Sequence, residues 1–204
     1  ERVRREKAAA DAAAAAAPKD IDVPVVVPSI MLRVAETPLV WGAVPEQVAV
    51  KQGAGADLAV PFERRYGLAV DPERHVLPAN GTKEAVYSLA FALIGPGATR
   101  DVVIIPTPAY PVYESGARFA GATPWFVPLR SEDGWRFNPD RVPAEIWART
   151  ALLWLNSPHN PTGAVQDAAT GERLVRMARE QGFWIASDEA YSDLWFEGER
   201  PGTL

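Results

Sequence analysis

Four short segments of this chain carry most of the side chains that could do chemistry. They are residues 80–83 (Asn-Gly-Thr-Lys), 106–113 (Pro-Thr-Pro-Ala-Tyr-Pro-Val-Tyr), 156–163 (Asn-Ser-Pro-His-Asn-Pro-Thr-Gly) and 187–191 (Ser-Asp-Glu-Ala-Tyr). Each of the last three follows a run of apolar residues that indicates a strand. An open sheet of parallel strands builds its ligand site from the loops at the carboxyl ends of those strands. The segments therefore predict one shared site.

Composition excludes several other kinds of site. The 204 residues include no cysteine and two histidines, His75 and His159, so disulfides, thiolate chemistry and a histidine-rich metal centre are excluded. The net charge of −5 gives no basic surface for nucleic acid. No apolar run reaches the length of a membrane span, and the alanine-rich, charged start is unlike a signal peptide. We therefore expect a cytoplasmic protein that binds neither nucleic acid nor membranes.

Strands and helices alternate over most of the chain. The predicted strands are residues 102–105, 123–127, 151–155 and 183–186, with a short extended piece at 76–78. The predicted helices are residues 1–20, a segment that ends at Gly67, a segment from 82 through Ile94, residues 113–120 and residues 171–181. Residues 21–61 show no sustained period and are left unassigned. We expect residues 1–61 to form an N-terminal arm and a poorly readable segment, and residues 62–204 to form the larger part of one domain.

This alternation predicts an α/β fold built from βαβ units. Right-handed crossovers place helices on both faces of a mostly parallel sheet, which gives three layers. The same rule places ligands at the carboxyl ends of the strands.

Taken in order, the four segments resemble the cofactor pocket of class I and II aminotransferases, which are fold type I enzymes that use pyridoxal 5'-phosphate. Asn-Pro-Thr-Gly alone is a weak signal, and Asp-x-x-Tyr alone is weaker, but the ordered set is specific. The resemblance covers residues 62–204 and implies an incomplete large domain of that fold. The amino-acid sequences of residues 76–86 and 107–121 are most similar to those of succinyldiaminopimelate aminotransferases.

The resemblance implies roles at the ring end of the cofactor. Asp188 would face the pyridine nitrogen and keep it protonated, because a buried carboxylate beside a cation stays ionised. Asn160 and Tyr191 would hydrogen-bond the phenolic oxygen of the ring. The structural alternatives are a helix N-cap for Asp188, a turn-former before Pro161 for Asn160, and a half-buried core aromatic for Tyr191.

The other implied roles concern stacking and the phosphate. Tyr110 would stack on the ring, and Tyr113 is expected to face the core instead. Gly81, Thr82 and Lys83 open a helix whose backbone N–H groups would bind the phosphate. The alternative for Lys83 is a surface lysine in the first turn. His159 lies at a position that varies in the family, so we interpret it as a loop residue, and no metal site is expected.

The chain departs from the family in two places. The Schiff-base lysine of the family lies in a Ser-x-x-Lys segment beyond Tyr191, with one arginine after it and another near the C-terminus. The chain ends at Leu204 and has no lysine after Lys83, so no catalytic residue is assigned and the fragment alone is expected to be inactive. The strands expected next are absent, which would leave a sheet edge unpaired.

The second departure is in residues 21–61. They contain neither a Ser-x-Gly-x-Pro stretch nor a Tyr-Pro-Gly-Leu-Arg segment, although the spacing to residue 62 fits the family. We interpret this as a compensated pair of frameshifts, and translation of the other two frames should recover the motifs. Genuine divergence or an assembly artefact are the alternatives.

The implied function is transfer of an amino group from an amino acid such as glutamate to a keto acid, in lysine and diaminopimelate biosynthesis, by a homodimer when full length. Two alternatives stay open. One is a pyridoxal-phosphate-dependent lyase of the same fold. The other is a non-catalytic, aminotransferase-like ligand-binding domain, which would need a basic winged-helix module ahead of it.

Overall fold

The computed structural model describes residues 29–34, 37–43, 71, 75–79, 81–198 and 200–203. Four parallel strands form the centre of the sheet: β4 (Val102–Thr107), β5 (Thr123–Pro128), β6 (Thr150–Asn156) and β7 (Trp184–Asp188). They lie in the order β7-β6-β4-β5. All four predicted strands are confirmed, with ends that shift by one or two residues.

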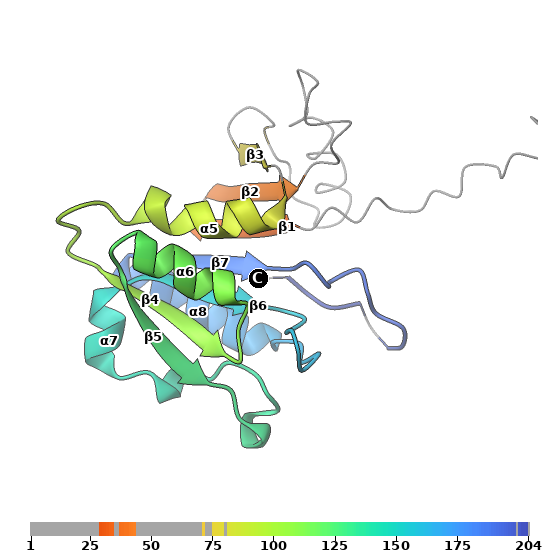
Figure 1. Cartoon of the computed structure of the whole chain (residues 1–204). Helices are drawn as coiled ribbons and strands as arrows, with labels where there is room; N and C mark the ends of the chain where they lie inside the picture. Colours follow the sequence, from red (N-terminus) through yellow and green to blue (C-terminus); the bar gives the residue numbers. More distant parts are fainter. Residues whose placement is uncertain are drawn as a thin grey trace, which may run out of the picture.

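Helices cover both faces of this sheet, as predicted. Helices α5 (Thr82–Leu93) and α6 (Pro111–Phe119) pack on one face, where Val103 and Ile105 of β4 point. Helices α7 (Ala144–Arg149) and α8 (Ala168–Gln181) pack on the other, with Val102 and Ile104. Successive side chains of a strand point to opposite faces, so the uninterrupted apolar run of β4 feeds two cores. Figure 1 shows α5 and α6 in front of the sheet and α8 behind it.

Close contact between α5 and α6 fixes the position of α6. A Cβ added to Gly116 would lie 2.7 Å from the backbone oxygen of Tyr87, which is too close for any side chain. Glycine therefore allows α6 to approach α5, and the approach buries Tyr113 between α6 and the sheet. The sequence did not predict α7 or the two short 3-10 turns before it, η1 (Ser131–Asp133) and η2 (Pro139–Arg141).

A second group of strands extends the sheet beyond β7. β1 (Ser29–Val34) pairs antiparallel with β7 and with β2 (Thr37–Ala43), and β2 pairs in parallel with β3 (Val76–Ala79). The expectation of an unpaired edge is therefore wrong at β7, because β1 from the unassigned segment occupies it. Only two residues separate β1 from β2, and antiparallel strands can be joined by so short a turn.

The remaining expectations for the N-terminal part stay predictions. Those for residues 1–20, for the helix that ends at Gly67 and for Asn80 lie outside the described residues. The boundary between residues 61 and 62 also stays a prediction. None of the helices in the described ranges is long and apolar enough to cross a membrane.

Candidate functional site

The loops after β6 and β7 are joined by a set of short hydrogen bonds. Asn156 and Asp188 are register partners at the carboxyl ends of these neighbouring strands. The backbone oxygen of Asp188 accepts from Asn156 Nδ2 at 2.8 Å and from the Ser157 amide at 3.1 Å. Asn156 Oδ1 in turn accepts from the backbone amide of Asn160 at 2.8 Å. Asn156 therefore fixes the start of the 156–163 loop against the end of β7, a role that the sequence did not reveal.

Asp188 is one of two buried acidic residues at this edge, with 8% of its surface exposed; the other, Glu189, is 3% exposed and hydrogen-bonds Ser187 on the opposite face. The Oδ2 of Asp188 accepts a hydrogen bond from the Tyr113 hydroxyl, and its Oδ1 accepts from the Ala190 amide at 3.3 Å. Burial raises the pKa of the Asp188 carboxyl, and these two hydrogen bonds oppose the rise. Within the described part of the chain no lysine or arginine forms an ion pair with it. Both of these donors, the Tyr113 hydroxyl and the Ala190 amide, are neutral.

Tyr113 connects this carboxylate to the core. Its ring stacks on Trp154, with ring centroids 4.4 Å apart and an interplanar angle of 13°. The Tyr110 ring is nearly perpendicular to the Tyr113 ring, and their centroids are 5.9 Å apart. The expectation that Tyr113 faces the core is confirmed, since 3% of it is exposed. Burial, followed by the negative charge of Asp188, raises the pKa of Tyr113, so its hydroxyl stays a donor. No sequence pattern indicated that the hydroxyl would meet Asp188.

Asn160 and Tyr191 come together across two loops. Asn160 Nδ2 donates to the Tyr191 hydroxyl at 3.1 Å, although the two residues are 31 positions apart. Tyr191 is 38% exposed and Tyr110 is 37% exposed, so both rings present a face to solvent. Three of the predicted residues, Asp188, Asn160 and Tyr191, thus belong to one hydrogen-bonded set of loops, and Tyr110 borders it through Tyr113.

Gly81, Thr82 and Lys83 form the start of α5. Gly81 adopts φ 109°, a conformation that glycine tolerates and other residues rarely adopt. No side chain caps the first turn of α5, so its N–H groups point outward at the positive end of the helix dipole. In Figure 1 the arrowheads of β4 and β7 point towards the side on which α5 begins. No hydrogen bond joins these three residues to the set around Asp188 within the described residues.

The structure excludes one alternative left open for Asp188 and confirms that His159 is a loop residue. Asp188 is not the N-cap of a helix, because residues 190–193 form a turn that is closed by backbone hydrogen bonds from Ser192 to Glu189 and from Leu194 to Tyr191. His159 is a loop residue, but it is 7% exposed and both of its ring nitrogens are hydrogen-bonded, so it is part of the packed interior. A polar residue between prolines gives no sequence signal for such burial.

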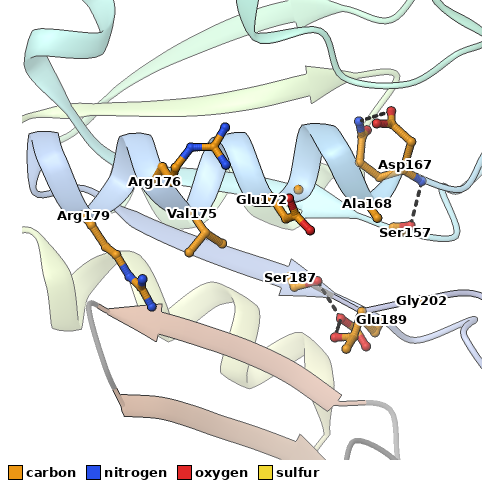
Figure 2. Close-up of a pocket in the computed structure, with 13 residues that line it drawn as sticks. Ser157, Asp167, Ala168, Glu172, Val175, Arg176, Arg179, Ser187, Glu189 and Gly202 are labelled. Atoms are coloured by element: carbon orange, nitrogen blue, oxygen red, sulfur yellow. Dashed lines mark hydrogen bonds between the residues drawn. The ribbon is translucent and has the colours of Figure 1, made fainter.

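A pocket of about 520 Å³ lies elsewhere, between α8 and the end of β7 (Figure 2). Its lining includes Ser187 and Glu189, whose side chains are joined by a hydrogen bond of 2.9 Å, and charged side chains of α8 such as Glu172. None of the seven predicted cofactor-binding residues lines it. Ser187 and Asp188 are neighbours in a strand and point to opposite faces, so the pocket lies on the α8 face while Asp188 meets α6. The buried polar groups, rather than this open pocket, define the candidate site.

Comparison with known proteins identifies the family. The sequence model described as "Aminotransferase class I and II" matches residues 52–203. The chain belongs to the class I and II aminotransferase family.

Relatives of this aminotransferase chain include enzymes named for diaminopimelate substrates. It is 37% identical over 143 residues to an LL-diaminopimelate aminotransferase of Aquifex aeolicus, which covers 70% of the chain and 36% of that protein. The corresponding enzyme of Desulforudis audaxviator is 42% identical over 142 residues, which covers 69% of the chain and 35% of that protein. The chain therefore spans about a third of the length of the curated relatives it matches.

Solved structures of aminotransferases share the fold. A probable N-succinyldiaminopimelate aminotransferase from Thermus thermophilus superposes with a TM-score of 0.65 at 36% identity, over 72% of this chain and 39% of the other. An aspartate aminotransferase from the same organism, with maleate, gives 0.63 at 38% identity, over 72% and 38% of the two chains. These neighbours confirm the predicted fold class.

Proposed function

We propose that this chain is part of a pyridoxal-phosphate-dependent aminotransferase, and that Asp188 is the residue that defines its cofactor site. The observation that carries the proposal is a carboxylate that is 8% exposed and whose donors among the described residues, Tyr113 and Ala190, are both neutral. A buried carboxylate is costly unless a cation or several donors compensate it. A protonated ring nitrogen would supply that cation and lower the pKa that burial raises.

The neighbouring groups fit the rest of such a cofactor. Asn160 Nδ2 and the Tyr191 hydroxyl, 3.1 Å apart, can both donate to a phenolic oxygen. The half-exposed ring of Tyr110 offers a face for stacking. The uncapped amides of Thr82 and Lys83, preceded by Gly81, fit a phosphate. When bound, pyridoxal phosphate supplies an electron sink for negative charge at the carbon that bears the amino group.

The residues of this chain would then act as binding and tuning groups. Asp188 would hold a proton on the ring nitrogen, and the Tyr113 hydroxyl would keep that carboxylate oriented. Asn160 and Tyr191 would set the acidity of the phenolic oxygen by donating to it. The α5 amides would hold the phosphate. None of these groups abstracts a proton from the substrate, so the fragment by itself is proposed to be inactive.

The proposed reaction moves an amino group from an amino acid such as glutamate to a keto acid. The names of the relatives favour a diaminopimelate-type compound in lysine biosynthesis as the other substrate. We further propose a cytoplasmic homodimer in the full-length protein. Sequencing the gene beyond codon 204 should reveal a Ser-x-x-Lys segment, and a stop codon directly after Leu204 would contradict this part of the proposal.

The cofactor site can be tested with the chain itself. Titration with pyridoxal phosphate, followed by quenching of tryptophan fluorescence, should give saturable binding. Replacing Asp188 with alanine removes a charged partner and should weaken binding about 10- to 100-fold, the usual effect of losing a hydrogen bond to a charged group. Asp140→Asn, at an exposed ion pair with Arg173, is the matched control and should bind like the parent. Equal affinities in D188A and the parent would refute the role of Asp188.

Activity gives an independent check. The chain loaded with pyridoxal phosphate and supplied with glutamate and a keto acid should form no 2-oxoglutarate. Turnover by the purified 204-residue chain would show that a residue within it can replace the expected lysine. Lys83→Ala would then show whether that residue is Lys83.

A further inference from the structure

His159 links two of the loops that make up the candidate site. Its Nε2 lies 2.9 Å from the backbone oxygen of Pro108, which is 51 positions away in the sequence and two residues before Tyr110. Its Nδ1 lies 2.8 Å from the Thr162 hydroxyl within its own loop. With 7% of its surface exposed, His159 is buried between the loop after β4 and the loop after β6.

The hydrogen-bond partners of His159 determine its tautomer. A carbonyl oxygen can only accept, so Nε2 must carry the proton that is shared with Pro108. Thr162 Oγ1 accepts from the Ala164 amide at 3.3 Å, which leaves its own proton free to be donated to Nδ1. Burial lowers the pKa of His159 more than the Pro108 carbonyl raises it, so the ring is neutral at pH 7. The neutral ring therefore bridges the loops with one donor and one acceptor, both used.

The backbone of His159 strengthens the same bridge. Its amide donates to the Ala164 oxygen at 2.8 Å, and its carbonyl accepts from the Gly163 amide at 2.7 Å. The loop around it is thus closed on itself, and the next residue, Asn160, is held by Asn156. The His159 ring is therefore anchored in a fixed loop, and its hydrogen bond to the Pro108 oxygen holds the loop after β4 against it.

We propose that His159 is a positioning residue that sets the place of the Tyr110 ring relative to Asn160 and Tyr191. The proposal rests on the proposed function, because these three residues are, with Asp188, the groups assigned to the ring of the cofactor. His159 touches neither the cofactor nor the substrate in this assignment. It acts through Pro108, which leads directly into the segment that carries Tyr110.

A double-mutant cycle in the 204-residue chain tests this coupling. His159→Phe keeps a buried ring and removes both hydrogen bonds, and Tyr110→Ala removes the stacking face. Each single change should raise the dissociation constant for pyridoxal phosphate about five- to tenfold, the range of one lost aromatic contact. If His159 acts through Tyr110, the double variant should bind no more weakly than Tyr110→Ala alone. Multiplying effects would overturn the proposal.

Two companion measurements separate positioning from general loss of structure. His159→Gln keeps a donor that can reach the Pro108 carbonyl and should restore binding to within about twofold of the parent. The affinity for inorganic phosphate should be unchanged in His159→Phe, because the phosphate is assigned to α5. A parallel loss of phosphate binding would indicate a structural defect and contradict the proposal.

Amide hydrogen exchange tests the bridge without any cofactor. In His159→Phe, exchange should accelerate in residues 107–113 and 156–164 but not in α5. Unchanged exchange in residues 107–113 would overturn the proposal even if the parent binds pyridoxal phosphate. If the parent does not bind it, the proposed function fails, and the exchange data alone decide whether His159 joins the loops. Should His159→Phe fail to fold, Thr162→Val removes the Nδ1 partner together with the acceptor of the Ala164 amide, and it should also accelerate exchange in residues 107–113.

Discussion

The two ends of the central sheet carry acidic residues in different environments. At the amino ends, Asp101 before β4 and Arg149 before β6 form a two-pronged ion pair, with distances of 2.9 and 2.5 Å. Both side chains are more than a third exposed. At the carboxyl ends, Asp188 is 8% exposed and is held by Tyr113 and a backbone amide.

The contrast separates a structural use of charge from a functional one. A solvent-exposed ion pair contributes little to stability, and its charges keep most of their hydration. Burying a carboxylate that lacks a cationic partner costs stability, and such groups are concentrated at binding and catalytic sites. We therefore interpret the ion pair at the amino ends as a structural link between β4 and β6, and the carboxyl ends as the candidate cofactor site.

The comparison predicts the largest loss of stability at Tyr113. Tyr113→Ala removes a buried ring stacked on Trp154 and should lower the free energy of unfolding by about 3–5 kcal/mol. Tyr113→Phe keeps the stack and loses only the hydrogen bond to Asp188, so it should cost about 1–3 kcal/mol. Urea unfolding of the three proteins measures both values. Equal costs for the two variants would mean that the ring contributes nothing and the hydroxyl everything.

The sequence predicts the strands and their loops, but it does not predict the contacts between distant residues. The apolar runs at 102–105, 151–155 and 183–186 and the loops that follow them could be recognised from residue types, and the last two loops led to Asn160, Asp188 and Tyr191. The hydrogen bond from Tyr113 to Asp188 could not, because it joins residues 75 positions apart and depends on how closely Gly116 lets α6 approach α5. Long-range polar contacts of buried residues leave no local pattern.

The strand β1 is an element that the sequence did not predict at all. Residues 21–61 have no period that distinguishes a strand from a loop, yet β1 pairs along β7 through its backbone. Backbone pairing at a sheet edge does not require particular side chains. Such a partner is therefore invisible to an analysis that depends on side-chain patterns.

The two ends should also respond to pH in opposite directions. Because burial raises the pKa of Asp188, the folded chain binds a proton there before the unfolded chain does, and this contribution to stability grows as the pH falls towards 3.8. The difference in unfolding free energy between the parent and Asp188→Asn should therefore change in favour of the parent as the pH falls from neutral towards 3.8. Urea unfolding at several pH values measures this difference. A constant difference over the range would contradict burial as the dominant cause.

Asp101 provides the smallest and oppositely directed effect. Its hydrogen bond to Arg149 lowers the pKa of Asp101, so the stabilisation is complete above the unfolded value of 3.8 and is lost as the pH falls through the lower folded value. Asp101→Asn should cost at most about 1 kcal/mol at pH 7, because the pair is exposed to solvent. Added salt should shrink that cost further, whereas the effect of Tyr113→Phe at the buried end should not change. Urea unfolding at low and high salt measures both effects. A salt-independent loss of several kcal/mol in Asp101→Asn would contradict the interpretation of the Asp101–Arg149 pair as a weak, solvent-exposed ion pair.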